Sequence, residues 1–138
     1  MRVFWDTNLF VYLFEDYGQL SEATIALHSR MLERADELYT SAFTVGELLT
    51  KPTREAPDSV NWYRAAVARH SIVVPFDLDA AQAYARIRQA REIRPPDAIQ
   101  LACAAAGGAD LFVTNDDRLS RKIVPGVPVL SSLSAVPI

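Results

Sequence analysis

Two acidic residues follow short apolar segments whose composition predicts β-strands. Asp6 comes directly after residues 3–5, and Asp116 comes shortly after residues 111–114. If both strands lie near the centre of one parallel sheet, their carboxyl ends share an edge and the two carboxylates emerge together. Carboxylates so placed repel each other, and each favours protonation of the other. A divalent cation would relieve this repulsion, and Mg²⁺ or Mn²⁺ is the ion that oxygen ligands favour.

Two further acids stand where helices are predicted. Asp97 follows two prolines and begins an almost wholly apolar helix, whose amino-terminal end must lie near the core. It is either a ligand or a first-turn acid that complements the helix dipole. Gln100, one turn on, either shares the cleft or is the single polar residue of an exposed stripe. Glu47 has capping-box spacing with Thr44 and could simply bond its backbone amide; Gly46 beside Glu47 would equally admit a substrate.

The elements that would position these residues alternate along the chain. Strands are predicted at residues 3–5, 37–41, 72–75, 111–114 and 127–130. Helices are predicted at residues 9–14, 21–35, 44–51, 57–70, 79–91 and 95–106, with Pro52 ending the third and Asp79 capping the fifth. Short apolar strands that alternate with helices predict an α/β fold, in which a parallel sheet is covered on both faces.

Composition narrows the class of protein. The chain has 138 residues, half of them hydrophobic, and a net charge of −3, which predicts one globular domain and excludes a highly basic nucleic-acid coat. Cys103 cannot form an internal disulfide, which suits a reducing cytosol. No apolar run approaches the ~20 residues that span a bilayer, and the first residues reach Asp6 too soon for a signal peptide. We therefore expect a cytoplasmic protein.

Four motifs in order give the sequence a family resemblance. They are Asp6-Thr7-Asn8, Glu47 before two leucines, residues 96–102 beginning Pro-Asp-Ala, and residues 113–116 reading Val-Thr-Asn-Asp. Each is weak alone, but the ordered set over nearly the whole chain resembles a PIN domain. Within that family it is most similar to the VapC-type toxins of toxin–antitoxin pairs. The resemblance implies a single domain over residues 1–138 and a three-layer α/β/α sandwich with a central parallel sheet of about four to five strands.

The resemblance also implies an activity and a site. It implies a metal-dependent endoribonuclease that hydrolyses RNA phosphodiester bonds with Mg²⁺ or Mn²⁺ and inhibits translation or growth. The metal-binding and catalytic acids would be Asp6, Glu47, Asp97 and Asp116. The supporting polar residues would be Thr7, Asn8, Thr114 and Asn115, and Asp117 is a second acid in the last motif, either a ligand or the start of a short helix. The implied partners are an RNA substrate, a small VapB-like antitoxin and a second copy in a homodimer, with no membrane.

Basic and aromatic residues near these motifs are the candidates for substrate binding. Lys51, Arg54, Arg94 and Arg118 are candidate phosphate contacts. Trp62 and Tyr63 either stack on bases or pack in the core or an interface. The two histidines, His28 and His70, lie in predicted helices away from the acids and offer no alternative catalytic set.

Two other functions stay open from the sequence. A PIN fold could bind RNA or act as a scaffold without cleavage, although an intact set of four acids argues against this. A phosphatase of the haloacid-dehalogenase type also begins with an acid after its first strand, but it needs a second Asp where this chain has Asn8. A dinucleotide-binding domain would need a glycine-rich turn after the first strand, and this chain has none there.

Overall fold

A single five-stranded parallel sheet runs through the computed structural model, which describes residues 1–138. The strands are β1 (Arg2–Trp5), β2 (Glu37–Ser41), β3 (Ile72–Val74), β4 (Leu111–Thr114) and β5 (Val129–Ser132). Their order is β3-β2-β1-β4-β5, and every neighbouring pair is parallel. The chain therefore runs from β1 outward to β2 and β3, returns to β4 on the other side of β1, and then continues outward to β5. The direction of the strand order changes between β1 and β4. Parallel α/β sheets bind ligands at such a switch point, outside the carboxyl ends of the strands.

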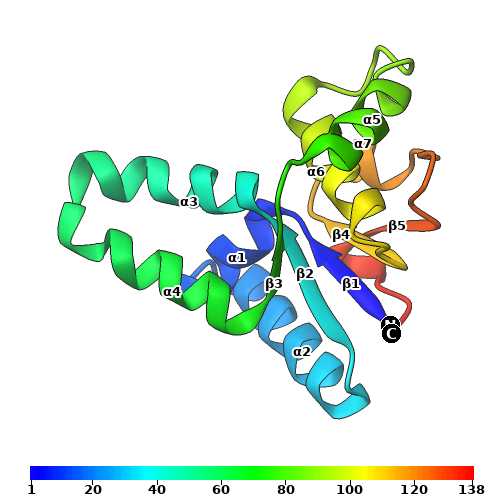
Figure 1. Cartoon of the computed structure of the whole chain (residues 1–138). Helices are drawn as coiled ribbons and strands as arrows, with labels where there is room; N and C mark the ends of the chain where they lie inside the picture. Colours follow the sequence, from blue (N-terminus) through cyan, green and yellow to red (C-terminus); the bar gives the residue numbers. More distant parts are fainter.

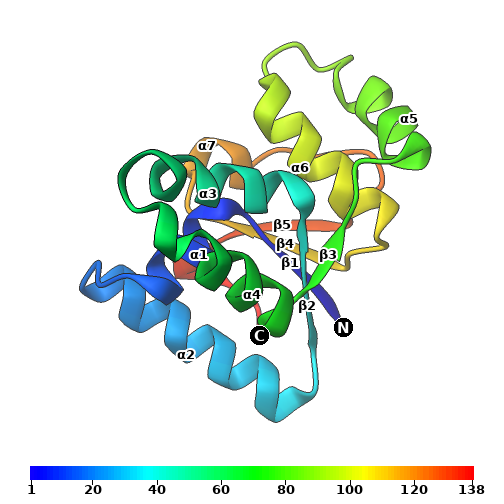
Figure 2. The same ribbon diagram turned by 60° about the vertical axis from the view of Figure 1, so that its left-hand side comes forward.

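Helices cover both faces of the sheet, as Figure 1 shows. The helices are α1 (Thr7–Phe14), α2 (Gln19–Arg34), α3 (Ala42–Glu55), α4 (Val60–His70), α5 (Leu78–Ile87), α6 (Pro95–Ala106) and α7 (Asp117–Ser120), with 3₁₀ turns at Pro57–Ser59 and Leu133–Ala135. Helices α1 to α4 lie on one side, where α3 and α4 extend away from the sheet as a pair, and α5 and α6 lie on the other (Figure 1 and Figure 2). The predicted three-layer α/β/α architecture is confirmed.

The pleat of the strands explains why both faces are apolar. Val3 and Trp5 join a core with side chains of α1, α2 and α4. Phe4, between them, points to the opposite face, where it stacks on Phe112 with ring centroids 5.3 Å apart. Because successive strand residues face opposite sides, a strand buried on both faces needs an unbroken apolar run. These three residues of β1, Val3, Phe4 and Trp5, are fully buried, whereas Arg2 at its start is exposed.

Helix α6 lies close against the sheet because its side chains are small. Ala98, Ala102, Cys103 and Ala104 are buried completely. The helix begins at two prolines and is followed by Gly107, where an added Cβ would meet the Val74 side chain at 3.0 Å. This close packing brings the first turn of α6 to the carboxyl edge of the sheet.

Several predicted boundaries are wrong. Helix α3 begins at Ala42, with Ser41 as its N-cap, and continues past Pro52 to Glu55. Pro52 has no amide hydrogen to bond the Leu48 carbonyl, but its own carbonyl accepts from the Ala56 amide at 2.8 Å and so completes the last turn. Helix α5 spans 78–87, capped by Asp77 rather than Asp79, and the last strand spans 129–132.

The apolar spacing of helix α2 predicts its buried face only in part, because Leu27 and Met31 are buried but two other apolar residues are not. Ile25 and Leu32 are 52% and 66% exposed, whereas Ser21 and Thr24 are buried beside Leu27. The hydroxyl of Thr24 bonds the Leu20 carbonyl at 2.8 Å, which lets it enter the core without an unpaired polar atom. None of the helices combines the length and apolar composition that a membrane-spanning segment requires.

Candidate active site

Asp6 stands at the switch point, directly after β1. Its Oδ1 accepts a hydrogen bond from the Thr7 amide at 2.8 Å, which caps α1, and its Oδ2 accepts from the Thr114 hydroxyl at 2.8 Å. Its own amide donates to the Val113 carbonyl at 3.0 Å. Since β1 and β4 are neighbours in register, the carboxylate is held between two strand ends.

The surroundings of Asp6 disfavour its charge. Burial raises the pKa of Asp6 from its ordinary 3.8 to about 6, and the charges of Asp97 and Glu47 act in the same direction. The hydrogen bonds from Thr114 and Thr7 oppose this rise. The ion pairs of the structure all lie elsewhere, so no Lys or Arg neutralises Asp6. A buried carboxylate without a cationic partner is a typical feature of a functional site.

Asp97 and Asp116 extend the acidic site away from Asp6. Burial raises the pKa of Asp97 and the charge of Asp116 adds to the rise, whereas Arg94 and Arg118 lower it. Asp97 and Asp116 line one small hollow together with Arg118. One oxygen of Asp116, Oδ1, caps α7 by accepting from the amides of Arg118 and Leu119 at 3.0 and 3.2 Å. Its second oxygen has no hydrogen-bond partner.

Glu47 lies on the other side of Asp6, on α3. The capping-box alternative is wrong, because α3 begins at Ala42 and the Thr44 amide donates to Ser41 instead, at 3.1 Å. The Oε1 atom of Glu47 accepts a hydrogen bond from the hydroxyl of Thr7. Thr7 is therefore bonded to both neighbouring acids, through its amide to Asp6 and through its hydroxyl to Glu47.

A network of buried polar side chains supports these acids. Eight polar residues of the chain are buried, and five of them gather at this edge of the sheet: Thr40, Ser41, Thr44, Gln100 and Thr114. Gln100 is 2% exposed, so it does not stand on an exposed stripe. Its Nε2 donates to the hydroxyls of Thr7 and Thr44 at 2.9 and 2.8 Å. Ser41 donates to its Oε1.

Thr40 and Ser41 did not stand out in the sequence as site residues. The signal that could have found them is their position, because two polar residues end the predicted strand 37–41. That end lies at the same edge as Asp6 in a parallel sheet. The hydroxyl of Thr40 bonds the Trp5 carbonyl at 3.0 Å and so ties β2 to the residue before Asp6.

Three of the predicted supporting residues lie apart from the acids. Asn8 is exposed. Asn115 turns toward α1, where its Nδ2 donates to the Tyr12 hydroxyl at 2.9 Å. Asp117 is exposed at the start of α7 and lines a hollow beside β5, different from the one that holds Asp97 and Asp116.

The candidate basic residues separate into two groups. Arg94 and Arg118 stand close enough to Asp97 to lower its pKa. The structure adds Lys122, which lines the same hollow as Asp97 and Arg118 and lies 3.9 Å from Glu92. Lys51 lies on the opposite side of the site, in the groove described below, and Arg54 lies beside Glu55 at 3.7 Å.

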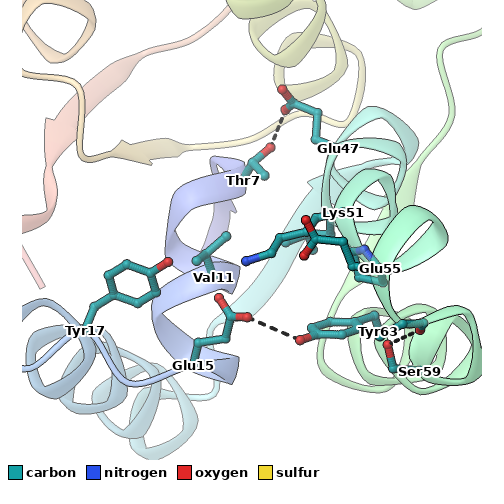
Figure 3. Close-up of a pocket in the computed structure, with 12 residues that line it drawn as sticks. Thr7, Val11, Glu15, Tyr17, Glu47, Lys51, Glu55, Ser59 and Tyr63 are labelled. Carbon is teal, nitrogen blue, oxygen red and sulfur yellow. Dashed lines mark hydrogen bonds between the residues drawn. The ribbon is translucent and has the colours of Figure 1, made fainter.

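A groove of about 390 Å³ leads away from Glu47 between α1 and the α3–α4 pair. Figure 3 shows Thr7 and Glu47 at one end and the hydrogen bond between Glu15 and Tyr63 at the other. Lys51 and Glu55 project from α3 into the space between them. Tyr63 faces this groove, whereas its neighbour Trp62 is 56% exposed, which excludes the core position for Trp62.

The donor set matches a hard divalent cation in its chemistry. Asp6, Glu47, Asp97 and Asp116 offer carboxylate oxygens only, which Mg²⁺ and Mn²⁺ prefer. The hydrogen bonds leave acceptor capacity free, because one oxygen of Glu47 and one of Asp116 have no partner. In their present positions, no three acids are close enough to hold one ion together. The acids instead interact pairwise, in the order Glu47, Asp6, Asp97 and Asp116.

The protein is therefore of the α/β class, with helices on both faces of a parallel sheet. Its acidic site lies at the carboxyl edge of the sheet, at the switch point between β1 and β4. The family model of the PIN domain matches residues 3–123. The chain therefore belongs to the PIN domain family, which decides against the phosphatase alternative. A search of the curated proteins finds no match.

Solved structures share the fold at low sequence identity. The VapBC2 structure from Rickettsia felis, bound to a promoter DNA fragment, contains a chain with a TM-score of 0.77 and 17% identity, over 96% of this chain and 98% of that chain. A chain of DNA-bound VapBC from Salmonella typhimurium has a TM-score of 0.73 and 21% identity, over 96% of this chain and 98% of that chain. A chain of VapBC-1 from nontypeable Haemophilus influenzae has a TM-score of 0.71 and 15% identity, over 98% of this chain and 100% of that chain.

Proposed function

We propose that this protein is a divalent-metal-dependent endoribonuclease and the toxin of a toxin–antitoxin pair. The observation that carries the proposal is the position of Asp6, which is buried among like charges and has no cationic partner. A fold that keeps such a carboxylate at its switch point is consistent with a cation that binds there in the working state. Membership of the PIN domain family and the VapBC neighbours support this proposal.

Each acid has a proposed part in phosphodiester hydrolysis. Asp6, Glu47, Asp97 and Asp116 are the residues that would hold Mg²⁺ or Mn²⁺, which supplies an activated water and neutralises phosphate charge. Asp6 is oriented by Thr7 and Thr114, and Glu47 by Thr7. Asp97 is the residue that we propose accepts the proton of the attacking water, because its raised pKa makes it a stronger base than an ordinary aspartate and, unlike Asp6, it lines an open hollow.

The RNA backbone is proposed to approach from the side of Asp97. There Arg94, Arg118 and Lys122 balance the three acids of the hollow, Glu92, Asp97 and Asp116, whereas the groove beyond Glu47 carries three acids, Glu15, Glu47 and Glu55, and one Lys. A phosphate is therefore repelled less by the first surface than by the second. Of the four basic residues predicted from the sequence, Arg94 and Arg118 are therefore the ones that we propose as phosphate contacts.

Arg118→Ala is expected mainly to weaken RNA binding. Loss of one phosphate contact would raise KM several-fold and reduce the magnitude of the salt slope by about 1, with a smaller change in kcat because Arg118 also lowers the pKa of Asp97. The measurement is cleavage of a single-stranded RNA at several salt concentrations. Arg64→Ala, which removes an exposed Arg on α4, is the control; an equal loss in both variants would show that only overall charge matters.

The groove between α1 and the α3–α4 pair, which is lined by acidic residues, is proposed as the binding site of the antitoxin. A basic side chain from a partner would be neutralised among Glu15, Glu47 and Glu55, and the groove opens directly onto the acidic site at Thr7. A VapB-like protein bound there would cover Glu47 and block the site. The homodimer implied by the resemblance remains part of the same proposal.

The proposed function is tested with the purified protein and with induced cells. We expect RNA cleavage with Mg²⁺ or Mn²⁺, none with EDTA, and growth arrest on induction that disappears for Asp97→Asn. Mapping RNA 5′ ends after brief induction would identify the cut site. If RNA stays intact with metal present, or if Asp97→Asn still arrests growth, metal-dependent cleavage is not the activity.

A further inference from the structure

The short contacts of the buried side chains around Gln100 each join a donor to an acceptor, and together they indicate where the hydrogens point. Ser41 donates to the amide oxygen of Gln100, which fixes the orientation of the amide group. Its nitrogen then faces Thr7 and Thr44 and donates one hydrogen to each hydroxyl oxygen, at 2.9 and 2.8 Å. Since a hydroxyl has a single hydrogen, Thr7 and Thr44 must direct theirs elsewhere.

The remaining hydrogens complete the network. The Thr40 hydroxyl lies within donating distance of the Trp5 carbonyl at 3.0 Å and of the Thr44 oxygen at 2.9 Å. The hydrogen of Thr7 goes to Glu47, which as a carboxylate can only accept. The Thr7 oxygen therefore accepts from Gln100 while its hydrogen bonds Glu47, and the direction of the Thr7 hydroxyl follows from that of the Gln100 amide.

We propose that Gln100 is a positioning residue, which holds the Thr7 hydroxyl as a donor to Glu47 and thereby fixes the Glu47 carboxylate beside Asp6. The hydrogen bond from Gln100 to Asp6 Oδ1 is long, at 3.5 Å, compared with 2.9 Å to the Thr7 hydroxyl. It acts through Thr7, whose amide bonds Asp6 and whose hydroxyl bonds Glu47. The inference rests on the proposed function, because it matters only if these two acids hold a cation.

Two substitutions separate the parts of this proposal. Gln100→Leu keeps the size of the side chain but removes both donors, so that the Thr7 hydroxyl is free to turn away from Glu47. Gln100→Glu keeps the shape but reverses the hydrogen-bond direction, because a carboxylate accepts from Thr7 and Thr44. Glu47 then loses its donor, and a new charge stands beside Asp6.

The test is Mn²⁺ binding measured by calorimetry, together with kcat and KM for RNA cleavage. Loss of a residue that orients ligands weakens metal binding by about 10- to 100-fold. We expect Mn²⁺ binding to weaken about 10-fold in Gln100→Leu and about 100-fold in Gln100→Glu. In both variants kcat should be lowered and KM for RNA unchanged. The controls are Leu101→Val, a core change on the same helix, and Gln89→Glu, the same charge change at an exposed position; both should bind Mn²⁺ as the original protein does.

A second pair of variants tests the network from Thr44 on α3, by exchanging one hydroxyl for a methyl group on a side chain of the same shape. Thr44→Val removes the hydroxyl that accepts from Gln100, and Thr44→Ser restores it. We expect Thr44→Val to weaken Mn²⁺ binding and Thr44→Ser to retain it, a difference that a purely structural role would not produce.

The outcomes distinguish this inference from the proposed function. If the unaltered protein binds Mn²⁺ and the Gln100 variants bind it as tightly as Leu101→Val does, Gln100 is only a core residue and the positioning role is overturned. If Thr44→Val and Thr44→Ser bind Mn²⁺ equally, the network is overturned as well. If the unaltered protein neither binds Mn²⁺ nor cleaves RNA, the proposed function itself fails.

Discussion

Asp6→Asn is expected to abolish RNA cleavage and, at the same time, to stabilise the folded protein at pH 7 in the absence of metal. Removing one preorganised electrostatic contact from an active site lowers kcat on the order of 10²- to 10³-fold. An asparagine still supplies a side-chain oxygen to the Thr7 amide and so still caps α1. The catalytic loss would therefore come from the missing charge and not from a disrupted helix.

The gain in stability follows from the pKa of Asp6. This pKa is about 6 in the folded protein and 3.8 as its ordinary value, so between these values the folded state retains a proton that the unfolded chain has lost. The free energy of unfolding therefore falls as pH rises from about 4 to 6. A shift of this size corresponds to about 3 kcal/mol above pH 6, from which the weaker hydrogen bonds of a neutral amide subtract about 1 kcal/mol.

Thermal denaturation at several pH values in EDTA measures this effect. The two proteins should unfold at similar temperatures near pH 4, and Asp6→Asn should unfold several degrees higher at pH 7. Asp58→Asn, at an exposed position, is the control for loss of a charge. An Asp6→Asn variant that is less stable at pH 7 would show that the carboxylate is favourably placed without a cation, contrary to our interpretation of the site.

The sequence was sufficient for the features that depend on composition and strand direction. Val3 to Trp5 and Leu111 to Thr114 are apolar runs that only a sheet covered on both faces accommodates. Once two such strands are parallel, Asp6 and Thr114 must meet at one edge. The start of α6 was also predictable, because two prolines fix its first turn and small residues allow it to pack closely.

The sequence was not sufficient where a side chain selects a distant partner. Glu47 and Thr7 are 40 residues apart, and the nearby Thr44 offered a local capping bond that the early start of α3 excludes. The burial of Gln100 depends on how α6 is rotated over the sheet edge, which periodicity does not give. Ile25 and Leu32 show the same limit on α2, since apolar spacing does not reveal which of two faces meets the core.

A divalent cation is expected to raise the unfolding temperature of this protein strongly at pH 7.5 and weakly at pH 5. A ligand that binds only the folded state adds about 2.7 kcal/mol at a concentration 100-fold above its Kd, which for a chain of this length is a shift of several degrees. The pH dependence has its cause in Asp6. Because its folded pKa is about 6, the carboxylate is largely protonated at pH 5, and a cation must displace that proton before it binds.

The measurement is thermal unfolding with Mg²⁺ or Mn²⁺ against EDTA at both pH values, for the unaltered protein, Asp6→Asn and Asp58→Asn. The shift at pH 7.5 should persist in Asp58→Asn, because that exposed acid lies outside the site, and it should disappear in Asp6→Asn. Equal shifts in all three proteins would place the cation elsewhere on the surface. Loss of the shift in Asp6→Asn alone would mean that the cation offsets the same cost of a buried carboxylate charge that destabilises the folded protein, so that one carboxylate accounts for both its lower stability and its proposed activity.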